Sequence, residues 1–237
     1  MAQKKLKRFT EFKTLANALE YPVDMPGKWS GFFKNTNPIV LELACGRGEY
    51  TVGLSALDPA TNFIGVDVKG NRMYIGARQC IADNRTNAAF LRTQIEMLNT
   101  YFAPGEVAEI WITFPDPQLR TSRAKKRLTH PRFLRIYQQV LKPGGVIHLK
   151  TDSPDLYRFT KRVIELYQIL LVEDDNDIYG KPSIKKELTI KTHYEALDIA
   201  KSRKIHYLKF SLPEDIRQFD DELQEILKQE EHPGESQ

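Results

Sequence analysis

The sequence predicts an α/β fold: a doubly wound, mostly parallel sheet of seven strands with helices on both faces. Two observations predict it. Short β-branched or apolar runs alternate with longer amphipathic segments, and a glycine turn follows the first run. Because parallel neighbours cannot be joined by a tight turn, this alternation requires crossover helices. Ligands of such sheets bind outside the carboxyl ends of the strands, where we expect the chemistry.

Each element has its own signal. Apolar and β-branched runs indicate strands at Ile39–Leu43, Phe63–Asp67, Ala88–Leu91, Val107–Thr113, Val146–Lys150, Leu170–Glu173 and Ile205–Leu212. Amphipathic spacing indicates helices from about Glu49 and at Asn71–Ala82, Phe133–Leu141 and Asp155–Leu166. His130, directly before Pro131, marks the start of one of these helices.

Three segments are expected along the chain. Residues 1–37 mix lysines, aromatic residues, Pro and Gly without periodicity, which indicates a basic N-terminal arm leading into the α/β domain of residues 38–212. Residues 213–237 are expected to form an acidic, solvated helical tail. Nine acids and two bases fall in residues 214–237, so the formal net charge of +4 conceals +11 on the other 213 residues. Such a basic surface attracts polyphosphates, anionic membranes or acidic proteins.

Composition disfavours several classes of protein. Cys45 and Cys80 lack the paired spacing of a zinc site or a disulfide framework, which suits a reducing compartment. No run approaches the roughly 18 apolar residues that span a bilayer, and no apolar segment follows the N-terminal lysines. We expect a cytoplasmic protein with no membrane segment and no metal. Its oligomeric state, monomer or homodimer, stays open.

The turn after the first strand reads Glu42-Leu43-Ala44-Cys45-Gly46-Arg47-Gly48. Gly46 and Gly48 permit positive φ and a close approach of the backbone to a ligand. A dinucleotide fingerprint needs a third glycine where Thr51 stands, and no Lys-Ser/Thr pair follows to make a phosphate loop. An NAD or ATP site is therefore disfavoured.

Two carboxylates accompany this turn. Asp67 ends the second strand about 20 residues later, where an acid accepts hydrogen bonds from both hydroxyls of an unphosphorylated ribose. Glu42 lies beneath the turn and suits a positively charged ligand that carries an amino acid better than a pyrophosphate. Together with Gly46 and Gly48 they resemble the binding signature of class I methyltransferases, which have a Rossmann-like fold. This resemblance implies S-adenosyl-L-methionine as the cofactor.

The fourth strand runs into Phe114-Pro115-Asp116-Pro117, where two prolines hold Asp116 on a stiff loop at the expected mouth of the site. Residues 118–135 then contain seven bases and no acid. Such a run is usually a solvated face, but beside a reaction loop it supplies the phosphate-binding surface that a nucleic acid needs. We term five of these residues the basic strip: Arg120, Arg123, Lys125, Lys126 and Arg127.

Later motifs carry a closer resemblance. They are the Pro-Asp-Pro loop, Lys125-Lys126-Arg127-Leu128, Phe133-Leu134, Lys142-Pro143-Gly144-Gly145, Lys150-Thr151-Asp152 and Thr192-His193-Tyr194-Glu195. In order and spacing, over residues 38–212, they resemble the bacterial tRNA (guanine-N7)-methyltransferase family. Gln118 stands where that family commonly has Trp, and Thr121 and Ser122 thin the basic run.

The resemblance implies methyl transfer to guanine N7 in tRNA, usually at position 46 of the variable loop. It implies Asp116 as the catalytic residue and cofactor contacts at Glu42, Gly46, Gly48, Asp67, Glu96 and Asp116. It implies substrate contacts at Arg120, Asp152, Thr192, Tyr194 and Glu195. The RNA backbone is expected at Arg123, Lys125, Lys126 and Arg127.

Guanine N7 already carries an in-plane lone pair, so the reaction needs alignment rather than a general base, and alignment can contribute roughly 7–11 kcal/mol. Carboxylates such as Asp116 and Asp152 would favour the positive charge that moves onto the purine. Either Asp152 or Glu195 could read the guanine edge. Two other functions fit the same residues: a class I methyltransferase for another RNA, a protein or a small molecule, and a nucleic-acid-binding protein without catalysis.

Overall fold

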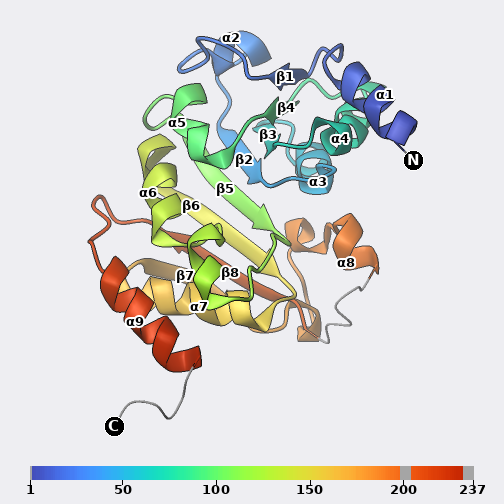
Figure 1. Ribbon diagram of the computed structural model, residues 1–237. Coiled ribbons are helices and arrows are strands. Elements are labelled where there is room, and N and C mark those ends of the chain that lie inside the picture. The colour runs from blue at the N-terminus through green and yellow to red at the C-terminus, as the bar shows by residue number, and fades with distance from the viewer. Residues whose placement is uncertain (1, 198–203, 232–237) are drawn as a thin grey trace.

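Eight strands form one sheet in the order β1-β4-β3-β2-β5-β6-β8-β7 (Figure 1). The computed structural model describes residues 2–197 and 204–231. The strands are β1 (Ala18–Glu20), β2 (Ile39–Leu43), β3 (Asn62–Asp67), β4 (Ala88–Arg92), β5 (Val107–Thr113), β6 (Leu141–Thr151), β7 (Leu170–Asp175) and β8 (His206–Ser211). Neighbours from β1 to β6 pair in parallel, and β8 runs antiparallel to both β6 and β7. The doubly wound, mostly parallel fold is confirmed.

The sheet has one strand more than the seven expected. β1 lies in the N-terminal segment and pairs with β4 at the edge of the sheet. Its three residues are too few for an alternating pattern, so the sequence carries no strand signal there. The division into arm, domain and tail stays a proposal, and residues 198–203 and 232–237 of the last two segments lie outside the described residues.

Helices cover both faces of the sheet (Figure 1). The α-helices are α1 (Ala2–Phe12), α2 (Trp29–Phe33), α3 (Glu49–Leu57), α4 (Gly70–Ala82), α5 (Leu98–Tyr101), α6 (Pro131–Val140), α7 (Pro154–Leu166), α8 (His193–Leu197) and α9 (Asp220–Glu231). Short 3-10 helices are η1 (Ile95–Met97), η2 (Thr121–Lys126), η3 (Ile178–Gly180) and η4 (Lys186–Thr189). α3 and α4 pack on one face, with α1 against α4, while α5, α6, α7 and α9 pack on the other. As expected, His130 caps α6, since its Nδ1 accepts a hydrogen bond from the Arg132 N–H.

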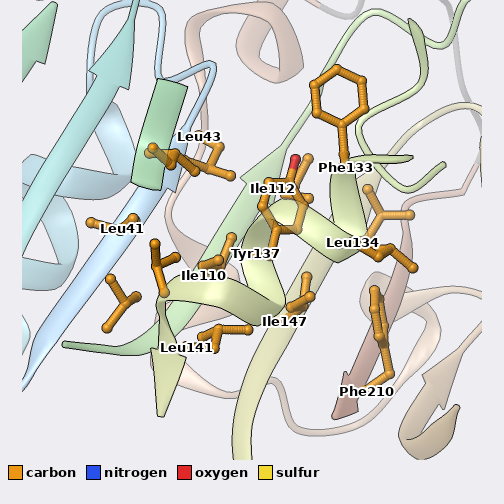
Figure 2. Close-up of a cluster of buried hydrophobic side chains, with 14 of the residues drawn as sticks. Leu41, Leu43, Ile110, Ile112, Phe133, Leu134, Tyr137, Leu141, Ile147 and Phe210 are labelled. Carbon is orange, nitrogen blue, oxygen red and sulfur yellow. The ribbon is translucent and has the colours of Figure 1, made fainter. Parts of the chain in front are cut away.

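Alternation along the central strands divides the core between the two faces. One face buries leucine and isoleucine side chains of β2, β5 and β6 against Phe133, Leu134 and Tyr137 of α6 (Figure 2). The opposite face holds a second cluster, in which Tyr50 of α3 and Trp111 of β5 pack with residues from the connection between β7 and β8. That connection therefore covers the sheet beside α3.

The strand order fixes where a ligand can bind. β2, β3 and β4 step outward in one direction, whereas β5 returns to pair with the other side of β2. The connections after β2 and β5 diverge at this point, which is where open α/β sheets bind ligands. Leu43 pairs with Ile112 in register, so the glycine turn and the Pro-Asp-Pro loop leave the sheet side by side.

The acidic tail is packed, and the prediction that it is a solvated helix is wrong. α9 buries Leu223 and Leu227 in the core cluster that also contains α6 and α7. Arg135 donates to both carboxylate oxygens of Asp220, at 2.9 and 2.6 Å, and the Tyr167 hydroxyl donates to the same carboxylate at 2.7 Å. The excess of acids in the sequence obscured the apolar positions that dock the helix.

Replacing Asp220 with Asn is expected to loosen this tail in a pH-dependent way. Hydrogen bonds from Arg135 hold the pKa of Asp220 below its ordinary value, so its stabilising contribution is present above the unfolded pKa and is lost as the pH falls through the folded pKa. Because the carboxylate is 37% exposed, we expect Asp220→Asn to lower the free energy of unfolding by only about 1 kcal/mol at neutral pH, measured by urea denaturation. The difference should disappear in acid. An equal loss in Asp221→Asn, an exposed neighbour, would contradict this account.

Candidate functional site at the carboxyl edge of the sheet

The turn between β2 and α3 is strained and open on one side. Ala44, Gly46 and Gly48 have positive φ values of 55°, 59° and 77°. A side chain on Gly46 would meet nothing within 4 Å, whereas one on Gly48 would stand 2.3 Å from the Phe90 ring. Gly48 is thus required by packing and by conformation, and Gly46 leaves its backbone accessible to a ligand.

Asp67 braces this turn from the end of β3. Its Oδ2 accepts a hydrogen bond from Gly46 N at 3.0 Å, and its Oδ1 accepts one from Lys69 N at 2.9 Å. Each carboxylate oxygen can accept a further bond. The side chain also lines a pocket of about 420 Å³. The acid expected to bind a ribose therefore faces a cavity at the point where the strand order reverses.

Other walls of this pocket come from the ends of β4 and α6 and from the basic strip; they include Thr93, Glu96, Lys126, Arg132 and Phe133. Thr93 is fully buried, and its Oγ1 has no hydrogen-bond partner among the described residues. A buried hydroxyl without a partner is uncommon and points to a polar ligand. Sequence analysis missed Thr93, because one threonine after a strand forms no pattern.

Glu96 lies at the rim of the same pocket. It is exposed on η1, and its carboxylate pairs with the Arg132 guanidinium of α6 at 3.5 Å. Both residues line the pocket, so the pair links two of its walls. Glu96 and Asp67 therefore line the same pocket. Of the two pocket residues that follow β4, Thr93 is buried and Glu96 is exposed.

Glu42 is buried beneath the turn and, in the described part of the chain, is not among the residues that line the pocket. Its Oε2 accepts hydrogen bonds from Thr51 N at 2.7 Å and Thr51 Oγ1 at 2.6 Å, and its Oε1 accepts one from Thr113 Oγ1 at 3.3 Å. Burial raises the pKa of Glu42 to about 7, although the Thr51 hydrogen bonds oppose the shift. Glu42 therefore joins the start of α3 to β2 and β5.

The loop after β5 presents Asp116 to solvent. Phe114 and Gln118 both have a φ of 47°, in the left-handed region that non-glycine residues seldom adopt. Asp116 is exposed, and its Oδ1 accepts a hydrogen bond from Gln118 N at 3.0 Å, which closes an Asx turn. Since β5 pairs with β2, Asp116 lies at the same edge of the sheet as Gly46.

Arg127 supports this loop, and its predicted contact with the RNA backbone does not fit its surroundings. The residue is 5% exposed, and its guanidinium donates to the carbonyl oxygens of Pro117, Gln118 and Leu119 at 3.1 to 3.3 Å. It also lies 4.4 Å from the centroid of the Phe159 ring. A buried guanidinium bound to backbone carbonyls cannot reach a phosphate on the surface, so we assign Arg127 to the scaffold.

The other cations of the basic strip face solvent. Arg120, Arg123, Lys125 and Lys126 are exposed along η2, and within residues 2–197 and 204–231 none of them forms an ion pair with an acid. Buried Ala124 anchors the same short helix. Because Lys126 also lines the pocket, the cationic surface begins at the edge of the cavity.

The Thr192–Glu195 motif lies beside α3. Thr192 is buried, and its Oγ1 accepts a hydrogen bond from Glu195 N at 3.1 Å. His193 N donates to Glu49 of α3 at 3.2 Å. The Glu195 side chain is 4% exposed and pairs with Lys150 at 2.9 Å. Thr192 and Glu195 thus fix the segment rather than face solvent.

Two predicted substrate residues remain at the surface of this edge. Tyr194 is 44% exposed, with the Arg72 guanidinium of α4 5.9 Å from its ring centroid. Asp152 directly follows β6 and is partly buried. The ends of three strands thereby bring Asp67, Asp116 and Asp152 to one edge of the sheet.

Within residues 2–197 and 204–231, no group of three His, Cys, Asp or Glu side chains is arranged to hold a metal ion. No helix in those ranges is long and apolar enough to cross a bilayer.

Residues 36–208 match a protein-family model described as "putative methyltransferase". The chain is 53% identical over 190 residues to a tRNA (guanine-N(7)-)-methyltransferase of Porphyromonas gingivalis, covering 79% of this chain and 77% of that protein. It is 45% identical over 224 residues to a protein of the same name from Bacteroides thetaiotaomicron, covering 91% and 88%. The solved 16S rRNA methyltransferase KamB has the same fold, with a TM-score of 0.60 at 15% identity over 80% of this chain and 95% of that one.

Replacing Arg127 with Met tests its place in the scaffold. We expect Arg127→Met to lower the free energy of unfolding by about 2 kcal/mol, because three partly buried loop carbonyls lose a charged donor. The exposed neighbour in Lys126→Met should change it by no more than about 0.5 kcal/mol. Chemical denaturation measures both. Wild-type stability in Arg127→Met would mean that its guanidinium is not needed by the loop.

Proposed function

The chain belongs to the tRNA (guanine-N7)-methyltransferase family, and we propose that the site at the carboxyl edge of its sheet carries out that reaction on position 46 of the tRNA variable loop. The reaction transfers the methyl group of S-adenosyl-L-methionine to guanine N7 and gives 7-methylguanosine. One observation carries the assignment to this site: a single pocket has Asp67 and the unpaired Thr93 hydroxyl in its wall and Lys126 of the basic strip at its border.

The pocket suits an adenosine that carries a sulfonium. Asp67 keeps acceptor capacity for the ribose hydroxyls, and the Thr93 hydroxyl can pair with a polar edge of the adenine. Ala44 of the glycine turn lines the pocket beside them. When bound, the cofactor supplies a methyl group activated by a positively charged sulfur. Glu42 acts indirectly in this proposal, because its hydrogen bonds hold the turn that the cofactor contacts.

Asp116 contributes charge rather than proton transfer. The N7 lone pair needs no base, but attack on the methyl group moves positive charge onto the purine. A fixed carboxylate near the base stabilises that charge in the transition state. The strained, proline-flanked loop and its Asx turn hold Asp116 in one position without reorganisation at the moment of reaction.

Asp152 is more accessible to a guanine edge than Glu195, because it is only partly buried whereas the Glu195 side chain is 4% exposed. Both oxygens of Glu195 already accept hydrogen bonds, one from Lys150 and one from the Tyr179 hydroxyl. Asp152 lies at the mouth of the site, where a carboxylate can accept from the guanine N1–H and exocyclic amine. Exposed Tyr194 offers a ring on which an unstacked base can lie.

The exposed part of the basic strip holds the tRNA backbone in this proposal. Among the described residues these four cations form no ion pair; Lys126 lines the cavity and the other three extend the cationic surface away from it, which a small-molecule substrate would not require. The target guanine must be unpaired or extruded to reach the methyl group, as a variable-loop base can be. A tRNA substrate also favours a cytoplasmic location.

Removing the charge of Asp116 tests the reaction. Asp116→Asn keeps the oxygen that accepts from Gln118 N but loses the charge, and we expect a fall in turnover of at least about 10²-fold, close to that of Asp116→Ala. Labelled methyl transfer to unfractionated tRNA, followed by borohydride and aniline cleavage, locates 7-methylguanosine. S-adenosylmethionine binding, measured separately, should change far less than turnover in both variants, because Asp67 and Thr93 of the pocket are intact.

Asp155→Ala on α7, where an exposed acid pairs with Arg158, is the matched control and should keep full turnover. Near-normal turnover in Asp116→Ala would exclude this loop from the reaction.

Neutralising the exposed strip tests tRNA binding. Changing Arg120, Arg123, Lys125 and Lys126 to Gln should weaken tRNA binding strongly. The slope of log Kd against log salt concentration should fall by up to about 3, because fewer counterions are released. The control changes Lys28, Lys34 and Lys142, exposed lysines near the amino ends of the strands. An unchanged salt slope in the strip variant would place the tRNA elsewhere.

A further inference from the structure

Lys150 is a lysine with no exposed surface, at the end of β6. Burying an ammonium is unfavourable unless it is paired and fully hydrogen-bonded. Its Nζ donates to Leu188 O at 2.9 Å, to Ile190 O at 3.0 Å and to Glu195 Oε2 at 2.9 Å. Three bonds use all the donors of an ammonium. All of them fasten one segment, residues 188–195, to the sheet.

Three aromatic rings surround the same ammonium. The centroids of Tyr50, Phe114 and Tyr179 lie 5.5, 5.6 and 5.7 Å from Nζ, within range of cation–π attraction. Tyr50 belongs to α3, directly after the glycine turn, and Phe114 begins the Pro-Asp-Pro loop. Phe114 N also donates to Lys150 O at 2.8 Å. One side chain thus contacts three separate parts of the site.

Glu195 completes the cluster from the other side. Its second oxygen accepts a hydrogen bond from the Tyr179 hydroxyl, so both oxygens are held in place. Burial lowers the pKa of Lys150, and the Glu195 carboxylate opposes that shift. The segment is also tight against α3, since a side chain on Gly53 would come within 2.8 Å of Ile190. The position of residues 192–195 is therefore set relative to both α3 and the Pro-Asp-Pro loop.

We propose that Lys150 is a positioning residue for methyl transfer. Through its bonds to Glu195 and two carbonyls, it holds the Thr192–Glu195 segment at a fixed position relative to the Phe114–Pro117 loop. The guanine then lies in line with the methyl group. This inference rests on the proposed function of the site. Replacing a buried ion pair with neutral groups of similar shape often leaves stability unchanged, although here the carbonyls of Leu188 and Ile190 also lose a donor, so stability is measured beside kcat. Stability and positioning can therefore be separated by experiment.

The test is Lys150→Met combined with Glu195→Gln, which removes both buried charges and keeps side chains of similar length. We expect a folded enzyme that binds S-adenosylmethionine and tRNA with nearly wild-type affinity, because the pocket and the exposed strip are intact. Turnover should fall by about 10²-fold, as small misplacements of reacting groups do. A fall in kcat with little change in KM separates positioning from a loss of folding or binding.

A second variant tests the positioning role of Lys150 if the double variant does not fold. Tyr179→Phe leaves the ion pair but releases one oxygen of Glu195, and we expect about a tenfold lower kcat. Lys181→Met, which breaks the ion pair between an exposed lysine of the same connection and Asp175 at the end of β7, is the control and should keep full kcat. Wild-type kcat in a folded double variant, or in Tyr179→Phe when the double variant is unfolded, would overturn the positioning role. A wild-type enzyme that forms no 7-methylguanosine would instead overturn the function of the site.

Discussion

Reversal of the strand order beside β2 separates the chain connections that follow β2 and β5 at one edge of the sheet. Because parallel strands carry their connections at the same ends, this edge also collects the ends of β3, β4 and β6. Asp67, Thr93 and Asp152 reach it from those three strands. A pocket, three carboxylates and the start of the basic strip thereby lie together at this edge.

Hydrogen bonds hold the backbone strain at this edge. Ala44 and Phe114 adopt left-handed backbone conformations that a side chain disfavours. The Gly46 N–H is fixed by the Asp67 carboxylate, the loop carbonyls by the Arg127 guanidinium, and the Phe114 N–H by the backbone carbonyl of Lys150. Charged residues in this fold include a buried set, Arg127, Lys150 and Glu195, that shapes the loops at this edge. The exposed cations of the basic strip are the set that we propose to face the tRNA.

The sequence predicted the central strands, the glycine turn, Asp67 and the Asp116 loop, because each leaves a local pattern of apolar alternation, glycine or proline. It did not predict β1, whose three residues depend on pairing with β4. Nor did it separate Arg127 from the exposed bases beside it, since burial is decided by a helix distant in sequence. Thr93 was missed for a similar reason: an unpaired hydroxyl is a property of the pocket, not of a motif.

A crystal structure with S-adenosylhomocysteine, the product of methyl transfer, would show whether the pocket beside Asp67 holds the cofactor. We expect ribose hydroxyls within hydrogen-bond distance of Asp67, an adenine edge paired with Thr93 Oγ1, and the sulfur facing the loop that carries Asp116. A nucleoside bound outside this pocket, with the Thr93 hydroxyl still unpaired and the sulfur turned away from Asp116, would contradict this expectation.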